Sequence, residues 1–444
     1  MDPVFLARLQ FAMTICFHFI FPPITIGLGF MLCIVEWLGW RGNDEVCQRI
    51  GRLFGRLFAI NFSAGIASGI VMLFQFGTNW ATYSRFVANV FGAPLAAEGF
   101  FAFFLESTFM GLYVFGRDRV SKGVHWLSLL IVTAGAGTLS AFFIIAANSW
   151  QQTPAGYVLR DGHAELTNIY EAIFNPSTLP RYFHVITACL ITGAFVFAAV
   201  GAWHVLKDRS SLLGQKALRF GVVLGLIFAV LEAVPFGHIH AEQVARTQPE
   251  KFAAIEGLYT SQTRAPLTLF GIPCMGRHSP ELKAKIEIPG LLSYLACDNV
   301  DAYVRGLQEF PREDWPPLFL PFMSYHLMVA LGMFFILIMA YAAYRLLRGR
   351  LYDDRLLLKA LVWSVSLPII AIELGWITAE VGRQPWVVYK LLRTADAASP
   401  AVSSGEIIFS LVLFGTIYLA LFRAWLFLMT GKAKEEPLPV VHQD

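Results

Sequence analysis

Residues 183–206 read FHVITACLITGAFVFAAVGAWHVL, a run of 24 residues that contains no Asp, Glu, Lys or Arg. The hydrocarbon core of a bilayer is about 30 Å thick, so a helix needs roughly 20 apolar residues to cross it. Backbone N–H and C=O groups in lipid must be satisfied within the segment, which excludes an open sheet or an irregular loop. The run therefore predicts a transmembrane α-helix.

Apolar runs of this kind recur along most of the 444-residue chain. Hydrophobic residues make up 56% of the sequence and charged residues 15%, whereas an ordinary soluble domain is about half apolar and about a quarter charged. By length, the spans are expected at approximately 11–39, 53–76, 94–115, 124–147, 183–206, 217–236, 318–346, 357–379 and 405–430. We therefore predict an all-α fold, a polytopic transmembrane helical bundle of about nine spans.

Lysine and arginine are concentrated in alternate connections between the expected spans. The basic set comprises residues 41–52, 117–122, 207–216 and 345–359, together with the tail residues Lys432 and Lys434. Cytoplasmic loops of membrane proteins carry the excess of Lys and Arg. This distribution predicts that the N-terminus lies outside and the C-terminus in the cytoplasm, and an odd number of spans agrees with it.

One outside connection, residues 237–317, is far longer than an ordinary link between helices, and such loops are usually functional or disordered. We expect a folded cap with a short helix from Pro249 to Leu258, although length alone favours a passive loop. The expected division of the chain is transmembrane helices one to six at 1–236, this extracytoplasmic loop, transmembrane helices seven to nine at 318–430 and a cytoplasmic tail at 431–444.

The six cysteines lack the spacing of a zinc or redox motif. Cys16, Cys33 and Cys189 lie in apolar segments, where a thiol ordinarily serves in packing. Cys274 and Cys297 share the long loop, which falls on the oxidising side of the predicted topology. A disulfide between Cys274 and Cys297 is therefore a hypothesis that we draw from the sequence.

Two pairs of acidic residues lie within apolar spans, where ionisable side chains are costly and usually mark a function or a buried pair. Glu98 and Glu106 are eight residues apart, about 12 Å along one helical face. Glu373 and Glu380 are seven apart and repeat the pattern. Such pairs suit a proton relay or a ligand site; the alternative is that each carboxyl is paired with Arg or Lys on a neighbouring helix.

Three histidines, His18, His184 and His326, fall in the outer halves or at the ends of the expected spans. Neutral imidazole is the commonest metal ligand in proteins and a common axial ligand of haem. A single histidine in a membrane helix is as often a packing residue with a hydrogen bond. Met328 would ordinarily fill space in the core.

Six stretches together are similar to one known family. They are EVGRQPW (380–386), LQFAMTICFHFIFPPITIG (9–27), NFSAGIASGIVMLFQFGTNW (61–80), EGFFAFFLESTFMG (98–111), TLSAFFIIAANSWQQTP (138–154) and the loop segment QPEKFAAIEGLY (248–259). In their order along the chain, and over nearly its whole length, these stretches resemble subunit I of the cytochrome bd-type quinol oxidases, in the form with a short quinol-binding loop.

The resemblance implies three haems in this chain: one low-spin haem b, one high-spin haem b, and a haem d or a third haem b in its place. His184 and Met328 would hold the low-spin haem. His18 and Glu380 would be the iron ligands of the other two, and which haem each binds stays open.

Further roles are implied by the same resemblance. Glu98 would lie beside the haem of His18, Glu106 and Ser140 would belong to a proton route, and Trp376 would lie between haems. The remaining residues would contact haem propionates, namely Arg8 and Arg383, or form the quinol-binding pair of the loop, namely Lys251 and Glu256.

The chain departs from the family pattern at one position. Many members have an arginine two residues before the axial methionine, where this chain has His326. An arginine stays cationic, whereas histidine titrates near neutral pH. We therefore expect a low-spin haem whose potential differs from the family's or depends more on pH.

The implied function is a terminal quinol:oxygen oxidoreductase of the bacterial cytoplasmic (inner) membrane. It would oxidise quinol outside, pass electrons from the low-spin haem b to the high-spin pair, and reduce O2 to water with cytoplasmic protons, which generates proton motive force without pumping. The implied partners are the lipid bilayer, a homologous membrane subunit II and a single-helix small subunit; no nucleic-acid partner is expected. The sequence does not decide whether the electron donor is ubiquinol or menaquinol, and it does not give the affinity for oxygen.

Two other classes of protein share some of these features. A secondary transporter also has many spans and intramembrane acids, but this sequence has no inverted repeat or interrupted span pair. A haem b membrane anchor of a quinone-linked dehydrogenase would need several bis-histidine pairs, and too few histidines lie in the spans here. An absorption spectrum with haem extraction separates the three classes.

Overall fold

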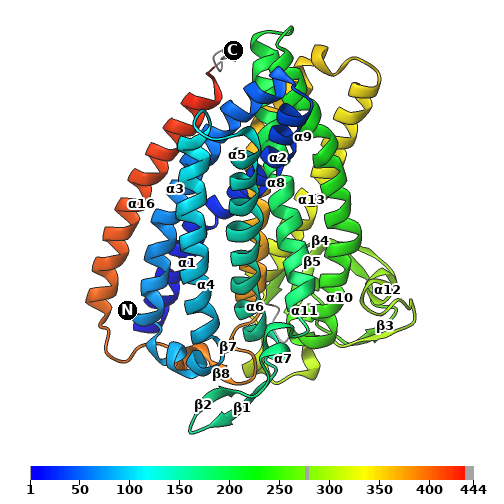
Figure 1. The fold of residues 1–444 in the computed structure, drawn as a ribbon. Helices are drawn as coiled ribbons and strands as arrows, with labels where there is room; N and C mark the ends of the chain where they lie inside the picture. Colours follow the sequence, from blue (N-terminus) through cyan, green and yellow to red (C-terminus); the bar gives the residue numbers. More distant parts are fainter. Residues whose placement is uncertain (1, 276–279, 436–444) are drawn as a thin grey trace.

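The computed structural model describes residues 2–275 and 280–435, and the side chains of residues 93, 94, 97, 98, 100–103, 136 and 275 lie outside the description. Its long helices run side by side as a bundle (Figure 1). Eight helical stretches of the described residues are long and apolar enough to cross a membrane: Pro3–Arg41, Glu45–Gly77, Lys122–Gln152, Thr178–Lys207, Leu212–Thr247, Phe319–Leu347, Arg355–Val381 and Ser404–Ala433. They correspond to eight of the predicted spans and confirm the all-α membrane bundle.

The ninth predicted span, 94–115, falls within α4 (Ala81–Gly116), a 36-residue helix that lies alongside the others (Figure 1). The remaining spans contain α3 (Glu45–Gly77), α5 (Lys122–Leu130) with α6 (Ser140–Gln152), α8 (Thr178–Lys207), α9 (Leu212–Leu231) with α10 (Gly237–Thr247), α13 (Phe319–Leu347), α14 (Arg355–Trp363) with α15 (Leu367–Val381), and α16 (Ser404–Ala433). The α5–α6 and α9–α10 pairs are joined by π-helical turns, which often lie at functional sites.

The first span is built from two helices, where the sequence predicts one. α1 (Pro3–His18) ends just before α2 (Phe21–Arg41), whose first turn contains Pro22 and Pro23. Proline has no backbone N–H to donate, so it is tolerated in a first turn but interrupts a continuous helix. The break leaves His18 as the last residue of α1.

Backbones of α2 and α8 touch through two glycines. A Cβ added at Gly27 would lie 2.1 Å from the carbonyl oxygen of Cys189, and one at Gly193 would lie 2.3 Å from the carbonyl carbon of Gly27. Small residues at helix crossings are the usual means of close packing in membranes, where lipid is as apolar as the side chains. These two glycines therefore fix the spacing of the central helices.

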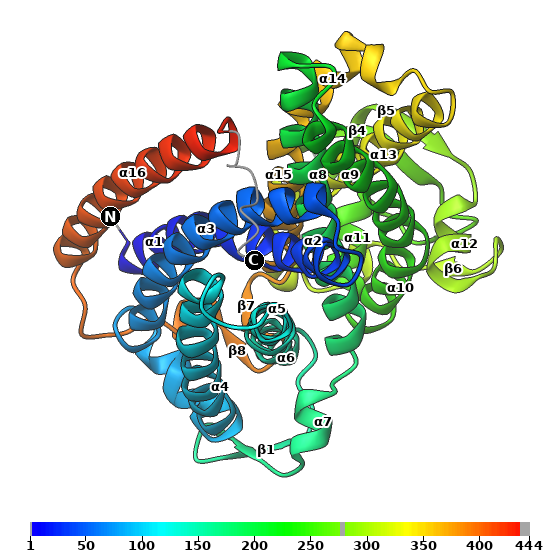
Figure 2. The same ribbon diagram turned by 45° about the horizontal axis from the view of Figure 1, so that its top comes forward.

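α16 lies at one edge of the bundle. It packs on α1 and α3 and is far from α13 and α14 (Figure 2). The ring of Phe17 stacks on Tyr418 with centroids 4.3 Å apart, and Trp425 Nε1 donates to Asn61 Oδ1 at 3.2 Å. The last span therefore closes the side of the molecule on which α1 lies.

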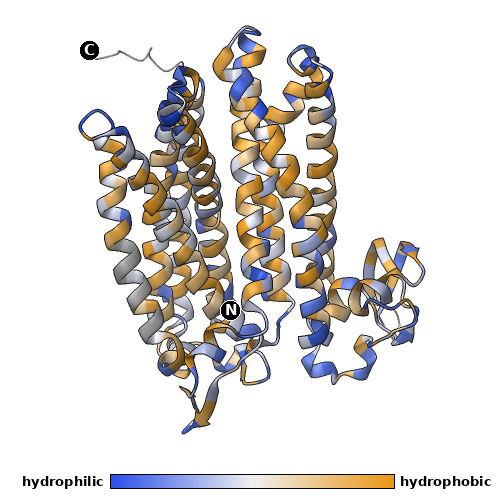
Figure 3. Cartoon of the chain, turned by 45° about the vertical axis from the view of Figure 1, so that its right-hand side comes forward, coloured by the Kyte–Doolittle hydropathy of each residue, from blue (hydrophilic) through white to orange (hydrophobic). Residues whose placement is uncertain are grey.

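The long loop is folded and lies beside one end of the apolar bundle (Figure 3). Helix α10 continues to Thr247, so the loop begins at Gln248, about ten residues later than predicted. Its elements are α11 (Pro249–Glu256), α12 (Leu291–Cys297), the hairpin β4–β5 (Leu267–Met275 and Pro280–Ile288) and the pair β3–β6 (Gln262–Thr263 and Tyr303–Val304). Smaller hairpins at the same end are β1–β2 (Tyr157–Arg160 and His163–Leu166), followed by α7 (Ile169–Ile173), and β7–β8 (Trp386–Val388 and Leu392–Arg393).

The two cysteines of the loop are both free. Cys274 belongs to β4, and Cys297 is the last residue of α12. A disulfide needs Cα atoms within about 7 Å and correctly aimed Cβ atoms. The expected disulfide is therefore wrong, because sharing a loop does not bring these two elements into bonding geometry.

Candidate functional site

A cavity of about 1680 Å³ lies in the core of the bundle. Ordinary ligand pockets measure roughly 300–1,000 Å³, so this cavity has room for more than one large group. Its wall brings together the predicted site residues Arg8, His18, Glu106, Ser140, His184, Lys251, Glu256, Met328, Trp376, Glu380 and Arg383. The side chain of Glu98 lies outside the described part of the chain.

The imidazoles of His18 and His184 are each contacted at Nδ1, but by different partners. His18 Nδ1 lies 2.9 Å from Ser68 Oγ of α3, and a Cβ on Gly69 would lie 3.1 Å from the same ring. His184 Nδ1 lies 3.0 Å from Glu232 Oε1, at the end of α9. Metal-binding histidines commonly use one nitrogen for the metal and the other for a hydrogen bond. In both residues Nε2 is then the nitrogen available to a ligand.

Met328 is positioned by the close approach of α13 and α15. A Cβ added at Gly375 would lie 2.9 Å from Met328 Sδ, so glycine is needed opposite the sulfur. Two residues earlier, His326 lies with Nδ1 2.9 Å from the carbonyl oxygen of Phe322 and Nε2 2.9 Å from that of Thr268. His326 thus links α13 to β4 of the loop.

Glu380, near the end of α15, is surrounded by hydrogen-bond donors. Arg383 donates to its Oε2, and Asn148 Nδ2 of α6 donates to its Oε1 at 3.0 Å. Arg181 of α8 in turn donates to Asn148 Oδ1. Arg383 is 4% exposed and pairs with Glu380 from three residues further along the same segment, not from a neighbouring helix.

The two loop residues implied for quinol binding are buried rather than solvated on a surface helix. Lys251 is 6% exposed, and its Nζ donates to Gln152 Oε1 at 3.2 Å and to the carbonyl oxygen of Ala379 at 3.1 Å. Burial lowers the pKa of Lys251 well below its usual value. Burial raises the pKa of Glu256, 2% exposed, to about 7, and a hydrogen bond with Tyr325 lowers it in part.

A second set of contacts fastens α11 to the segment that follows α15. Tyr389 OH donates to Glu250 Oε2 at 2.6 Å, and Lys390 Nζ lies 3.2 Å from Glu250 Oε1. Burial and the Glu250 carboxylate raise the pKa of Tyr389. The backbone N–H of Tyr389 and the side chain of Arg383 both donate to Gln151 of α6, at 2.9 and 3.0 Å. The loop helix is therefore connected to the surroundings of Glu380.

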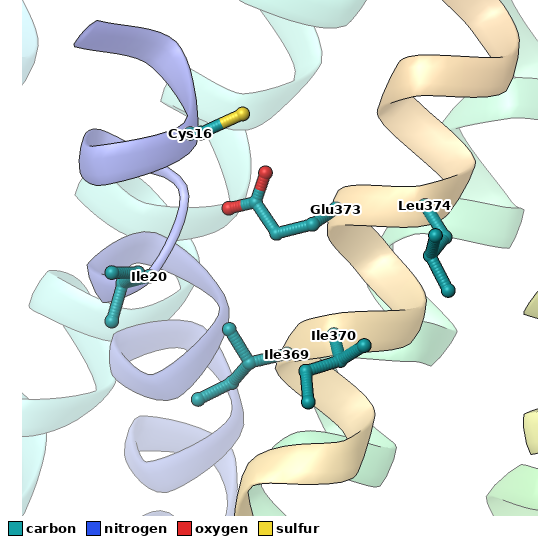
Figure 4. A pocket seen from close by; sticks show the side chains of 6 residues that line it. All are labelled: Cys16, Ile20, Ile369, Ile370, Glu373 and Leu374. Atoms are coloured by element: carbon teal, nitrogen blue, oxygen red, sulfur yellow. The ribbon is translucent and has the colours of Figure 1, made fainter. Parts of the chain in front are cut away.

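Glu373 has a different environment from Glu380, although both lie on α15. Its carboxylate points toward Cys16 at the end of α1 (Figure 4). The thiol contacts the carboxylate, and neither oxygen has a hydrogen-bond partner on a nitrogen or oxygen atom of the described residues. The pocket around it measures about 370 Å³ and is otherwise lined by Ile20, Ile369, Ile370 and Leu374.

The polar residues of the cavity wall that were not predicted from the sequence include Arg181, Glu232 and His240. Arg181 Nη1 is buried without a hydrogen-bond partner among the described residues, and the ring of His240 lies 5.1 Å from that of His184. Glu232 lies inside the predicted span 217–236. The rule that an ionisable residue within a span is a functional candidate therefore applied to it.

The fold and the cavity define a polytopic membrane protein whose core is built to hold large prosthetic groups. The family model described as cytochrome bd terminal oxidase subunit I matches residues 6–437, and the chain belongs to that family. Haem is the cofactor of the family, quinol is its electron donor, and a second membrane subunit accompanies subunit I. The chain is thus part of a bacterial membrane quinol oxidase.

Individual relatives agree with this assignment over their full lengths. The cytochrome bd ubiquinol oxidase subunit 1 of Bacillus subtilis (strain 168) is 37% identical, covering 98% of this chain and 94% of that protein. The cytochrome bd-II ubiquinol oxidase subunit 1 of Escherichia coli (strain K12) is 34% identical, covering 98% and 97%. The structure of the bd oxidase from Geobacillus thermodenitrificans superposes with a TM-score of 0.90 at 32% identity, covering 97% of this chain and 98% of that one.

The residues on the cavity wall fit haem. Two imidazoles, a thioether and a carboxylate are the side chains that bind iron in haem proteins or in related iron sites. The buried, unpartnered nitrogen of Arg181 is a donor suited to an anionic propionate. The volume of the cavity exceeds what one ordinary ligand fills.

Proposed function

We propose that this chain oxidises quinol at the outer membrane face, passes the electrons through a low-spin haem b to a high-spin haem pair, and reduces O2 to water with protons from the cytoplasm. The observation that carries the proposal is one continuous cavity whose wall holds four candidate iron ligands and both loop residues Lys251 and Glu256. The quinol site and the iron sites then share one enclosure.

The cofactors in this proposal are two haems b and one haem d, or a third haem b in its place. His184 and Met328 hold the low-spin haem, while His18 and Glu380 are the ligands of the other two. Bound haem supplies one-electron transfer and an open iron position for O2. The protein holds these groups by the Nδ1 contacts of both histidines and by the glycine opposite the methionine sulfur.

At the quinol end, Glu256 accepts a proton from the quinol hydroxyl. Its pKa of about 7 lets the carboxyl take up and release a proton near neutral pH. Lys251 lies on the same helix and polarises a quinol oxygen by hydrogen bonding. Because α11 is outside the apolar spans, the protons released by quinol leave on the outer side.

Protons for oxygen reduction come from the cytoplasm along α4. Glu106 and Ser140 both line the cavity. Glu98 lies on the same helix about two turns nearer its outer end, so a proton moving outward would reach it after Glu106. Taking protons from one side and releasing them on the other separates charge without a pump. This direction depends on the N-terminus outside and the C-terminus in the cytoplasm, which the basic connections support.

The proton route is tested by a Glu106→Gln variant of the purified complex in vesicles, with Glu165→Gln on β2, whose side chain is 38% exposed, as the control. Oxygen consumption and charge movement should both fall with Glu106→Gln and remain with the control. Unaltered turnover and charge movement in Glu106→Gln would remove α4 as the route.

In the cell, the chain works with the homologous subunit II, and a single-helix small subunit completes the complex in the bacterial cytoplasmic membrane. Reduced-minus-oxidised spectra and haem extraction of the purified complex test the cofactor set. His184→Ala and Met328→Leu should each lose the six-coordinate cytochrome while the other haem signals remain. A full complement of six-coordinate cytochrome in both variants would contradict the assignment.

A further inference from the structure

The helix that passes His184 changes its winding at that point. α9 ends at Leu231, residues Glu232–Phe236 form a π-helical turn that contains Pro235, and α10 begins at Gly237. Proline cannot donate a backbone hydrogen bond, and π-helical turns frequently accompany functional side chains. The turn is held against α8 by Phe236, whose ring stacks on Phe183 with centroids 5.5 Å apart.

The first residue of this turn, Glu232, points at the candidate haem ligand. Its Oε1 lies 3.0 Å from His184 Nδ1, and the two side chains are 14% and 20% exposed. Oε2 is buried and has no hydrogen-bond partner among the described residues. Within the described part of the chain, no Lys or Arg forms an ion pair with Glu232, so His184 is the group it faces.

A charged carboxyl in the interior of a membrane protein is costly and needs a reason to be there. Histidines that bind metals usually donate the second ring N–H to a carboxylate or a carbonyl. This contact fixes the tautomer and the ring orientation, and it makes the coordinating nitrogen more basic. The Glu232 carboxylate lies 3.0 Å from His184 Nδ1, the ring atom at which this arrangement needs an acceptor, whereas His18 contacts a neutral hydroxyl at the same ring atom.

We infer that Glu232 is a positioning residue for His184: it accepts the Nδ1–H, presents Nε2 to the low-spin haem iron and lowers the midpoint potential of that haem. This inference rests on the proposed function, in which His184 is an axial ligand. A thioether ligand raises the potential of haem iron. Glu232 thus opposes the effect of Met328 and sets the potential at which the quinol electron is received.

The test is a redox titration of the purified complex, followed at the absorption band of the low-spin haem. Glu232→Gln keeps an acceptor but removes the negative charge, so the midpoint potential should shift upward from that of the parent. Glu232→Leu removes the acceptor, so the potential should shift upward and part of the six-coordinate signal should be lost. Glu242→Gln, ten residues along on α10 and paired with Arg246, is the matched control and should leave the potential unchanged.

Equal midpoint potentials in the parent and the Gln and Leu variants, at equal haem content, would overturn the inference, because a carboxylate that only joins two helices would not change the potential. If the Gln variant does not assemble, Glu232→Asp and Glu232→Asn are compared, and the Asn variant is expected at the higher potential. Equal potentials in that pair would also overturn it. Failure of the proposed function is distinct, because His184→Ala would then retain the low-spin signal.

Discussion

Glu373 and Glu380 lie seven residues apart on α15, yet their surroundings have little in common. Glu380 receives hydrogen bonds from Asn148 and Arg383, whereas Glu373 meets the Cys16 thiol in an apolar pocket. The difference comes from what surrounds each carboxyl: α6 brings amides and the segment after α15 brings Arg383 to Glu380, whereas the end of α1 brings mainly hydrocarbon to Glu373. The environment of an intramembrane carboxyl thus depends on the segments that meet at it.

The largest effect should come from Glu380→Gln. Removing one partner of a buried ion pair costs about 3–5 kcal/mol, because the other charge is left uncompensated. Here Arg383 would be left, with Arg181 close by. We expect a marked drop in the thermal unfolding temperature of the complex and a lower haem content, measured by extracting haem from the purified complex. An equal drop in Glu373→Gln would remove the distinction between the two carboxyls.

Asn148→Ala should have the next largest effect. The amide donates to Glu380 and accepts from Arg181. Its loss takes one donor from Glu380, which keeps Arg383, and leaves Arg181 as a buried polar group without this partner. Such groups cost about 1–3 kcal/mol, and thermal unfolding of the complex measures the change. Asn89→Ala on the exposed side of α4 is the control and should change little. An unchanged unfolding temperature in Asn148→Ala would mean that the amide between Glu380 and Arg181 is not needed for stability.

Tyr389→Phe tests how far the network around Glu380 extends toward the loop. The variant removes the hydrogen bond to Glu250, and the net cost of one hydrogen bond is about 1 kcal/mol. We expect α11 to be held less well, so that KM for quinol rises roughly fivefold while kcat is kept. Tyr303→Phe, which breaks the exposed pair with Glu309 in the same loop, should leave KM unchanged. A fall in kcat alone would place the effect elsewhere.

The pH dependence of Glu256 offers a test at a third carboxyl, which has one buried oxygen without a partner. Its pKa is raised from the ordinary 4.5 to about 7, so its contribution to stability is present below 4.5 and is lost as pH rises through about 7. Quinol oxidation should rise over the same range, as the carboxylate becomes available. In Glu256→Gln both dependences should flatten in rate assays and thermal scans; a persisting rise near pH 7 would assign it to another group.

The smallest effect is expected for Glu373→Gln. No ion pair and no hydrogen bond to a nitrogen or oxygen of the described residues is lost, so the stability should change by less than about 0.5 kcal/mol. Calorimetry of the complex measures the difference. A loss comparable to that of Glu380→Gln would reveal a partner of Glu373 contributed by another subunit.

The sequence was sufficient for the spans, because a long apolar run such as 183–206 has no other stable form in lipid. It was insufficient for the break after His18 and for the turn at Glu232, because both depend on how the backbone deviates locally from an α-helix. The motif-based residues, apart from Glu98, whose side chain lies outside the description, line one cavity, but Glu232 and His240 were missed. Their proximity to His184 depends on the rotation of α9 and α10 relative to α8, which periodicity alone does not determine.

The helix from Leu212 to Thr247 has 36 residues, which makes it about 54 Å long at 1.5 Å per residue. The hydrocarbon layer is only about 30 Å thick, so several turns stand clear of it. The loop that begins at Gln248 is therefore carried by a continuous helical stretch that extends beyond the hydrocarbon layer. A tilt of α10 relative to α9 would bend the chain at the π-helical turn Glu232–Phe236, whose first residue contacts His184.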